Sequence, residues 1–319
     1  MTEGLKDEYD AVVVGGGAAG LNGALMLARS RRSVVVIDAG APRNAPADGV
    51  HGLLGHDGLP PTELLRRGRA EVRRYGGEVV DGDVTTATKD GDGFAVTLAD
   101  GRTTWARRLL VTTGLVDELP DVAGLRERWG RDVVHCPYCH GWEVRDRAIG
   151  ILASGPAAVH QAMLFRQLSD DVVLFAHTTE GPPEDQAALL AARGVDVVTG
   201  EVAALVIEDD HIVGVRLTDG RVVERDVVAV GARMRARSGV LSDLGLRAVE
   251  HPSGMGEHVP SDATGRTDVP GVWVAGNVTD LSAQVGAAAA AGALAGAHLN
   301  ADLVADDAQR ALEATRLTA

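Results

Sequence analysis

The sequence predicts an α/β protein in which one doubly wound domain is inserted into another. Two observations support this prediction. A strand, a glycine-rich turn, a helix and a second strand follow one another near the start of the chain, and a similar succession begins again at Arg147. A buried strand and an alanine-rich helix then follow near the end of the chain. A length of 319 residues suits two domains, each with its own core.

The first unit opens with an apolar, β-branched strand predicted at residues 9–14 and the turn Gly15-Gly16-Gly17-Ala18-Ala19-Gly20. A helix is predicted at residues 21–32 and a second strand at residues 33–37, which ends at Asp38. A strand, a glycine-rich turn, a helix and an acid about twenty residues further on form the dinucleotide-binding pattern of Rossmann-like domains, in which the acid binds the adenosine ribose. A plain glycine turn is the alternative, but here all four features occur together. We therefore predict a dinucleotide site that includes Asp38.

Three glycines of this turn serve different purposes. Gly15 permits the tight bend, Gly17 lets a pyrophosphate approach the backbone, and Gly20 lets the helix pack closely against the strand. The N-terminus of the helix, with Ala18 and Ala19, then faces the phosphates.

The remaining elements divide the chain into two domains. Strands at residues 78–84, 94–98 and 109–112 are expected to form a small antiparallel insert and the return to the first sheet. The second unit has predicted strands at residues 148–152, 171–176, 195–198, 202–208, 212–217 and 227–230, with a helix through Leu168. A buried strand at residues 271–277 and a helix from Ser282 return to the first unit. We expect residues 1–117 and 245–319 to form the first domain and residues 118–244 to form the inserted domain.

Charge and hydropathy exclude several classes of partner. The formal net charge is -14 and the pI is about 5.1, so the protein repels phosphate backbones and anionic lipid surfaces, and we expect neither nucleic acid nor a membrane as partner. Residues 1–10 contain acids and lack the apolar core of a secretory signal. The longest apolar stretch, residues 285–299, is too short to span a bilayer and is expected to form a buried helix. We therefore expect a cytoplasmic protein.

The chain has only two cysteines, Cys136 and Cys139, in the sequence Cys136-Pro137-Tyr138-Cys139-His140. Two thiols at this spacing in a reducing compartment predict redox chemistry, because a thiolate is the nucleophile in thiol–disulfide exchange. His140 is the candidate both for lowering a thiol pKa and for transferring protons.

Other interpretations of this motif compete with redox chemistry. Cys-x-x-Cys-His also attaches c-type haem, which normally requires export, and a zinc site would need four ligands although no second cysteine pair exists. Cys-Pro-Tyr-Cys also occurs in glutaredoxins, which are much smaller. Two buried, reduced thiols are the purely structural alternative. Near the motif, His135 is either a second proton carrier or a packed histidine, and Tyr138 and Trp142 are expected to be packing groups.

Two further segments extend the pattern over nearly the whole chain, which resembles the low-molecular-weight thioredoxin reductase family. Residues 109–114, ending in Thr113-Gly114, and residues 271–280, containing Gly276-Asn277, are similar to the segments by which that family closes around FAD. The resemblance implies FAD as cofactor, two Rossmann-like three-layer domains and a homodimer. The family acid that binds the ribityl chain is replaced here by Asn277, whose amide oxygen still accepts a hydrogen bond. Gln284 and Val285 would occupy the helix end near the flavin.

The same resemblance gives the dithiol its roles. Cys139 is expected to lie against the flavin, whereas Cys136 exchanges with the substrate sulfur. In thioredoxin reductases an Asp that acts as acid and base follows the second cysteine. His140 replaces it here and keeps a group that can transfer protons.

The inserted domain departs from the reductase pattern. The nicotinamide turn would fall at residues 153–158, where its first glycine is replaced by Ala153. The family holds the 2′-phosphate of NADPH with arginines, whereas this chain has His177-Thr178-Thr179-Glu180 at that place, and Glu180 would repel the phosphate. These departures argue against NADPH, while NADH stays open.

A branch of the family keeps FAD and the cysteine pair but does not depend on NADPH. It comprises the dithiol oxidases of gliotoxin and holomycin biosynthesis, whose motif is similar to residues 136–141. The resemblance implies a flavin-dependent oxidase that forms an intramolecular disulfide in a small-molecule dithiol, with dioxygen as acceptor and hydrogen peroxide as product. The region Arg43-Asn44-Ala45-Pro46, with His51-Gly52 beyond it, also departs from the reductase pattern and is expected to line the flavin and substrate pocket, an ordinary surface loop being the alternative. Within it, Arg43 and Asn44 are the candidates for cofactor binding. The competing functions are an NAD(P)H-dependent thioredoxin reductase and a flavin-bound redox sensor without turnover.

Overall fold

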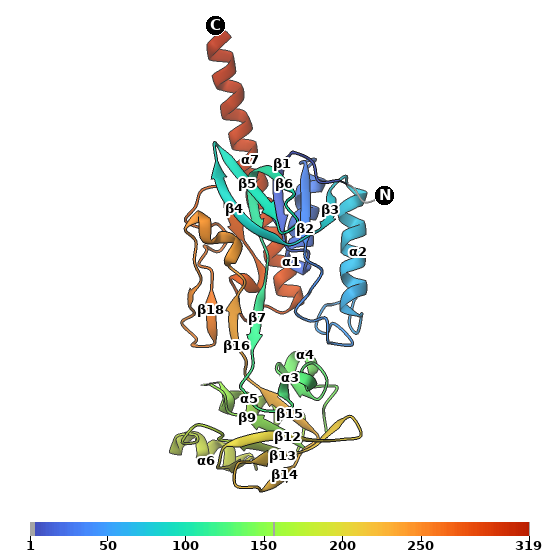
Figure 1. Cartoon of the computed structure of the whole chain (residues 1–319), viewed down its shortest axis with the longest axis vertical. Coiled ribbons are helices and arrows are strands. Elements are labelled where there is room, and N and C mark those ends of the chain that lie inside the picture. Colours follow the sequence, from blue (N-terminus) through green and yellow to red (C-terminus); the bar gives the residue numbers. More distant parts are fainter. Residues whose placement is uncertain (1–3, 156, 319) are drawn as a thin grey trace.

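Two α/β units lie one above the other along the longest axis of the molecule in the computed structural model, which describes residues 4–155 and 157–318 (Figure 1). The predicted fold class, two Rossmann-like domains with the second inserted in the first, is confirmed by the arrangement of the strands. The central parallel strands of both units are rich in valine and buried on both faces, as parallel strands covered by helices require.

The first unit contains a seven-stranded sheet in the order β3-β2-β1-β6-β5-β4, with β19 also paired to β6. These strands are β1 (Glu8–Val14), β2 (Val34–Asp38), β3 (Glu78–Asp81), β4 (Val84–Asp90), β5 (Gly93–Leu98), β6 (Thr103–Val111) and β19 (Val272–Val274). Strands β3, β2, β1, β6 and β19 are parallel, whereas β4, β5 and β6 form an antiparallel meander. Because β19 follows the second unit in the chain, both ends of the chain build this sheet.

Three helices cover the first unit: α1 (Ala18–Arg29), α2 (Pro61–Arg74) and α7 (Val285–Thr318). Helix α1 begins three residues before its predicted start, so its first turn lies at the glycine-rich bend. Helices α1 and α7 approach closely, since a Cβ at Gly292 would lie 1.9 Å from the carbonyl oxygen of Ala19, and one at Gly296 would lie 2.6 Å from that of Gly23. Only glycine at these positions permits this helix crossing.

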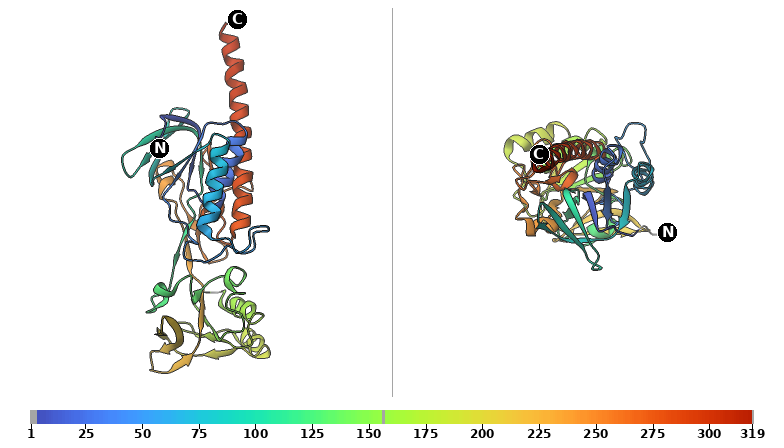
Figure 2. Two further views of the ribbon diagram at one scale, coloured as in Figure 1. Left: turned by 90° about the vertical axis from the view of Figure 1, so that its right-hand side faces the viewer. Right: turned by 90° about the horizontal axis from the view of Figure 1, so that it is seen from above.

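Helix α7 is much longer than the buried helix predicted for residues 285–299. Its first half packs in the core as far as Leu303, whereas its second half projects beyond the unit (Figure 2). Charged and polar residues dominate after Leu303, which explains why this half leaves the core. Among residues 4–155 and 157–318, no helix combines the length and the hydropathy needed to cross a membrane.

The second unit is built on a five-stranded parallel sheet in the order β11-β10-β9-β15-β8. Its strands are β8 (Val133–Val134), β9 (Ile149–Leu152), β10 (Val172–Phe175), β11 (Asp196–Val198) and β15 (Val227–Val230). An antiparallel sheet of β12 (Val202–Glu208), β13 (His211–Leu217) and β14 (Val222–Glu224) adjoins it. The helices are α3 (Leu125–Arg128), α4 (Pro137–His140), α5 (Ala158–Phe165) and α6 (Glu184–Ala192).

Two antiparallel strands, β7 (Leu115–Glu118) and β16 (Arg233–Ala236), connect the units (Figure 1). They belong to a sheet in the order β17-β18-β16-β7, with β17 (Val249–Glu250) and β18 (Gly256–His258), and the 3₁₀ helices η1 (Gly239–Leu244) and η2 (Gly276–Val278) lie in the returning chain. The sequence predicted that the chain crosses between the units twice, but not that the crossings form paired strands. The domain boundaries after residues 117 and 244 stay predictions.

Candidate active site

One cavity of about 1090 Å³ is lined by residues of both units and of the connecting strands. This volume exceeds the ~300–1,000 Å³ usual for drug-sized ligands and suits an extended dinucleotide. Every residue that the sequence singled out for binding or catalysis lines it, with the exception of Gly20: Gly15, Gly17, Ala18, Ala19, Asp38, Arg43, Asn44, Thr113, Gly114, Cys136, Cys139, His140, Gly276, Asn277, Gln284 and Val285. The fold therefore brings the predicted nucleotide residues and the predicted dithiol to one place.

The glycine-rich turn has the geometry that a pyrophosphate requires. Gly15 has a φ of +103°, which disfavours any other residue. A Cβ at Gly20 would lie 1.9 Å from the Gly15 carbonyl oxygen, so Gly20 lies outside the cavity because it serves the packing of α1. A Cβ at Gly17, by contrast, would meet no atom within 4 Å. Gly17 faces open space at the N-terminus of α1, where backbone N–H groups and the helix dipole favour an anion.

Asp38 is fixed at the end of β2 by two partners. The backbone N–H of Gly16 donates to one carboxylate oxygen at 3.0 Å, and Arg69 of α2 forms an ion pair with the other. Each carboxylate oxygen has a second lone pair, so the group can still accept a ribose hydroxyl. Sequence analysis missed Arg69, because its contact with Asp38 depends on how α2 packs.

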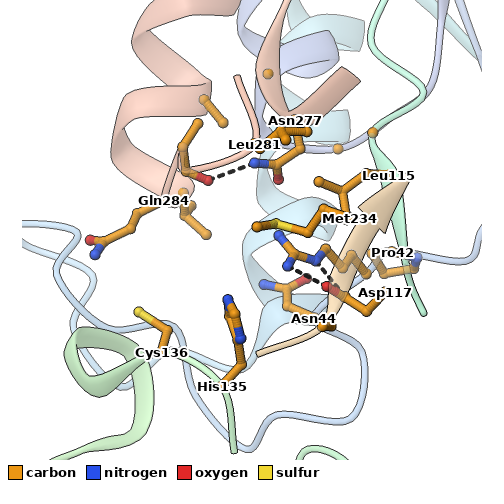
Figure 3. Close-up of a pocket in the computed structure, with 18 of the residues that line it drawn as sticks. Pro42, Asn44, Leu115, Asp117, His135, Cys136, Met234, Asn277, Leu281 and Gln284 are labelled. Atoms are coloured by element: carbon orange, nitrogen blue, oxygen red, sulfur yellow. Dashed lines mark hydrogen bonds and ion pairs between the residues drawn. The ribbon is translucent and has the colours of Figure 1, made fainter. Parts of the chain in front are cut away.

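Asn277 has the orientation that a bound ribityl chain needs. Its amide nitrogen donates to the carbonyl oxygens of Asp280, at 3.0 Å, and Ala283, at 2.9 Å. Both donors are therefore used, and the amide oxygen points into the cavity (Figure 3). Gln284 and Val285 follow at the start of α7, whose first turn contains no acid.

Arg43 and Asn44 line the cavity, which agrees with the predicted pocket wall and not with the alternative of an ordinary surface loop. Arg43 donates two hydrogen bonds, of 2.7 and 2.6 Å, to the buried carboxylate of Asp117 in β7 (Figure 3). On the same wall, the Thr113 hydroxyl donates to the carbonyl oxygen of Arg237 at 2.6 Å, and the backbone N–H of Arg237 donates to the carbonyl oxygen of Gly114 at 2.9 Å. These contacts attach the nucleotide-binding unit to the two connecting strands. Sequence analysis gave no role to Asp117.

The dithiol lies at the short helix α4. Cys136 is the N-cap residue and Pro137 occupies the first turn, where a residue without an N–H group fits well. The two sulfurs are 2.6 Å apart, and both cysteines are half-buried and reduced. Little movement is therefore needed to form a disulfide between them.

The two thiols differ in acidity. The hydrogen bond from Cys139 lowers the pKa of Cys136 to about 7, and the backbone N–H groups of Tyr138 and Cys139 and the charge of Arg43 act in the same direction. The same contact and burial raise the pKa of Cys139. Near neutral pH, Cys136 therefore supplies the thiolate and Cys139 holds the proton. The sequence predicted that a His140 imidazolium lowers the pKa of Cys136, but His140 is not among the groups that lower it.

His140 follows the dithiol and lines the same cavity, with a neutral rather than a charged ring. Burial lowers its pKa, against the opposing effect of Glu143. Its Nε2 is buried and has no hydrogen-bond partner among the described residues. A neutral imidazole with an open nitrogen can accept a proton from a neighbouring thiol.

Three other residues with aromatic rings lie near the motif, and two of them do not lie as the sequence predicted. His135 points into the cavity, and one of its ring nitrogens lies 2.9 Å from the Val230 carbonyl oxygen (Figure 3). Tyr138 and Trp142 were expected to pack, but their exposed fractions are 67% and 66%. The prediction was wrong because the segment that carries them lies at the molecular surface, and the guanidinium of Arg145 covers Trp142 at 4.1 Å from the ring centre.

The inserted unit shows no basic cluster at the predicted phosphate position. His177 accepts a hydrogen bond from the Val202 N–H at 3.0 Å, and burial lowers its pKa, so it adds no positive charge near neutrality. The Thr179 hydroxyl donates to the Ala176 carbonyl oxygen. In the predicted nicotinamide turn at residues 153–158, Ala153 is buried. Pro156 of this turn lies outside the described residues.

A glycine-turn nucleotide site and a dithiol that face one cavity define a flavin-dependent thiol–disulfide oxidoreductase, and the open space at Gly17 and the free oxygen of Asn277 fit a flavin cofactor. Residues 9–293 match the model of the pyridine nucleotide-disulphide oxidoreductase family, and the chain belongs to that family. The thioredoxin reductase-like resemblance is thereby confirmed.

Individual relatives agree with this family. The chain is 34% identical over 308 residues to "Thioredoxin reductase tcpT" of Claviceps purpurea (strain 20.1), covering 93% of this chain and 95% of that one. It is 30% identical to "Thioredoxin reductase sirT" of Leptosphaeria maculans, covering 92% and 93%. Among solved structures, HlmI is similar at 45% identity with a TM-score of 0.92 over both whole chains. An oxidoreductase from Agrobacterium tumefaciens is 36% identical, with a TM-score of 0.87, and the match covers 93% of this chain and 99% of that one.

Proposed function

We propose that the protein is an FAD-dependent dithiol oxidase, which forms an intramolecular disulfide in a small-molecule dithiol and uses dioxygen as electron acceptor to give hydrogen peroxide. The observation that supports this most directly is the position of the Cys136 and Cys139 sulfurs in the cavity of the glycine-rich turn, while residues 177–180 of the inserted unit include no lysine or arginine. The dithiol and the nucleotide-binding turn thus share one cavity. The second unit lacks arginine and lysine at the residues expected to hold the 2′-phosphate of NADPH.

The oxidised dithiol of the enzyme performs the exchange. A substrate thiolate attacks the Cys136 sulfur, the enzyme disulfide breaks, and Cys139 leaves with the electron pair. The second substrate thiolate then attacks the substrate sulfur of the mixed disulfide, so that the substrate disulfide forms and Cys136 leaves as a thiolate. Two electrons have then passed from the substrate to the cysteine pair. The residues of the glycine-rich turn, Asp38 and Asn277 would hold FAD, which would supply a two-electron acceptor for the dithiol and a route from there to dioxygen.

Cys136, Cys139 and His140 have different roles in this exchange. The low pKa of Cys136 makes it the better leaving group when the substrate disulfide closes. Cys139 has a raised pKa and takes up a proton when it leaves. The neutral ring of His140, with its open Nε2, can exchange that proton.

A second candidate function is a pyridine-nucleotide thioredoxin reductase. The names of the relatives from Claviceps purpurea and Leptosphaeria maculans favour it. In that case electrons would move in the opposite direction, from the inserted unit to the dithiol.

One experiment separates the two functions. The purified flavoprotein is mixed under argon with dithiothreitol, NADH or NADPH, the visible flavin absorption is followed, and peroxide is measured after air is admitted. We expect rapid bleaching by dithiothreitol, slow or no bleaching by NADPH, and one peroxide per disulfide formed. Rapid bleaching by NADPH together with thioredoxin reduction would contradict the oxidase proposal. Cys136→Ser is the matched control, because it should abolish dithiol oxidation and retain the flavin.

We also propose that the protein is a homodimer whose interface includes the projecting half of α7. Val304, Leu312 and Leu317 expose 53%, 45% and 89% of their surface there, which is costly for apolar side chains on an isolated helix. Sedimentation should give twice the mass of the chain. Leu312→Asp should shift the protein toward the monomer, whereas the surface substitution Arg316→Gln should not.

A further inference from the structure

The loop between β2 and α2 brings a further histidine, His51, to the wall of the cavity. Backbone hydrogen bonds hold this loop in place: the N–H of Val50 donates to the Leu59 carbonyl oxygen and the N–H of Gly58 donates to that of Val50, both at 2.8 Å. The position of His51 is therefore set by the fold and not by a loose surface loop. The sequence predicted His51 in the wall of this pocket, but neither the sequence nor the exchange reaction has given it a chemical role.

The imidazole of His51 lies between two carboxylates from different parts of the chain. Its Nδ1 is 3.5 Å from Asp57 in the same loop, and its Nε2 is 3.4 Å from Glu143 of the inserted unit. The exposed fractions of the Asp57 and Glu143 side chains are 69% and 41%, compared with 25% for His51. Both carboxylates thus connect His51 to solvent.

His140, by contrast, has no such connection of its own. Its Nε2 is buried and unpartnered within residues 4–155 and 157–318. The charged and titratable groups that act on its ring are Glu143, His51 and Asp48. Glu143 is therefore common to both histidines. A proton that His140 takes from Cys139 needs a route to water. Glu143, His51 and Asp48 are the groups beside His140 that can provide this route.

We propose that His51 is a positioning residue which, held between Asp57 and Glu143, passes protons between His140 and solvent during each thiol–disulfide exchange. The inference rests on the proposed dithiol chemistry of Cys136 and Cys139. In the reverse of the first exchange step, Cys139 gives its proton to His140 and attacks the Cys136 sulfur of a mixed disulfide, so that the enzyme disulfide forms and the other sulfur leaves as a thiolate. His140 then passes the proton to His51, and His51 releases it to water.

A reaction without dioxygen or substrate tests this step. The holoprotein is reduced with dithiothreitol, freed of it under argon, and mixed with a nitroaryl disulfide that releases a coloured thiolate. The first thiolate is released when Cys136 attacks. The second is released when Cys139 closes the disulfide, and only this phase requires the proton of Cys139 to leave.

In His51→Gln we expect the first phase to keep its rate and the second to slow by about tenfold. This is less than the ~10²–10⁴-fold that direct proton transfer contributes in enzymes, because His51 acts through His140. Added imidazole should restore the second phase in His51→Ala, because a small base can replace the missing ring. His56→Gln is the matched control, since His56 lies exposed in the same loop and does not line the cavity. It should leave both phases unchanged.

Other outcomes would overturn the inference. These are a second phase in His51→Gln as fast as in the wild type, an equal loss in His56→Gln, or a loss in His51→Ala that imidazole does not restore. If His51→Gln is too unstable to measure, Glu143→Gln serves instead and should slow the second phase, and an unchanged rate there would count against the route. Because the assay needs no oxidase activity, a failure of the proposed function in air would leave this result valid.

Discussion

Arg43 binds Asp117 through two hydrogen bonds, and the guanidinium so held contributes to the acidity of Cys136. The pair joins the loop after β2 to connecting strand β7, which leads into the unit that contains the dithiol. A contact between the two units thereby also adjusts the reactivity of the nucleophile.

Replacing this guanidinium should reduce the thiolate at Cys136. The pKa of Cys136 is about 7, so the thiolate predominates above that pH and is lost below it. Arg43→Gln removes a positive charge and raises this pKa, and a rise of half a unit corresponds to about threefold slower alkylation by iodoacetamide at pH 6. The pH dependence of the alkylation rate measures this shift.

Two controls make this measurement specific. Arg43→Gln also leaves the buried carboxylate of Asp117 without a partner, so the double variant with Asp117→Asn separates the loss of the guanidinium from the repulsion by that carboxylate. Arg145→Gln removes an arginine whose guanidinium lies over Trp142 and should leave the alkylation midpoint in place. An unchanged midpoint in both Arg43 variants would show that the guanidinium does not act on the thiol.

The two glycines of the nucleotide turn should respond differently to alanine. In Gly20→Ala the new methyl group collides with the Gly15 carbonyl oxygen, so we expect a loss of about 2–3 kcal/mol in the free energy of unfolding of the flavin-free protein. Gly17→Ala meets no protein atom and should leave that free energy within about 0.5 kcal/mol, yet it should weaken flavin binding at least tenfold if a pyrophosphate lies there. Urea unfolding and flavin titration measure the two effects. Equal flavin affinity in Gly17→Ala and the wild type would place the pyrophosphate elsewhere.

The local motifs could be predicted from sequence because each is made by neighbouring residues. The bend at Gly15, the acid at Asp38 and the dithiol of α4 belong to this kind. Contacts between distant segments could not, and these include the pairing of Arg43 with Asp117, 74 residues away, and the position of His51 beside Glu143. Sequence patterns give the type of element on which a residue lies, but they do not give the register in which two loops meet.

Aromatic residues show a second limit of the sequence. Tyr138 and Trp142 were expected to be packing groups, since large aromatic side chains bury much apolar surface. They are exposed because α4 is a single short turn at the edge of the second unit, and its inward side is taken by Gly141, where a Cβ would lie 2.3 Å from the Leu168 side chain. A pattern of apolar residues over so few positions does not show which side faces inward.

Asn277 should not be replaceable by aspartate. In this structure the amide nitrogen donates to two carbonyl oxygens, and Asn277→Asp would place a carboxylate oxygen against both. We expect this variant to lose about 1–3 kcal/mol in the free energy of unfolding and to bind flavin more weakly. Asn277→Ser, which removes the amide without adding charge, is the comparison, and it should cost less. If the aspartate variant is as stable as the wild type, the loop of residues 280–283 must rearrange around it.

Arg107 should determine how firmly α7 is held to the sheet. Its side chain is largely buried in β6 and donates to Asp10 of β1, at 2.9 Å, and to Asp306 and Asp307 of α7, both at 2.6 Å. These contacts lower the pKa of Asp306, while Arg32, followed by Arg107, lowers that of Asp307. Arg107→Gln leaves three carboxylates close together without this cation, so we expect a loss of about 2–3 kcal/mol near pH 7.

The pH dependence of this loss follows from the direction of the shifts. A carboxylate with a lowered pKa stabilises the fold at pH values above its ordinary pKa, 3.8, and the stabilisation disappears as the pH falls through the lower folded value. The difference between Arg107→Gln and the wild type should therefore be largest between pH 5 and 7 and should shrink below about pH 4. Thermal unfolding across this range measures it, with Arg126→Gln, at a surface-exposed arginine of α3, as the matched control. A difference that does not change with pH would mean that Arg107 stabilises α7 through packing and not through its three carboxylates.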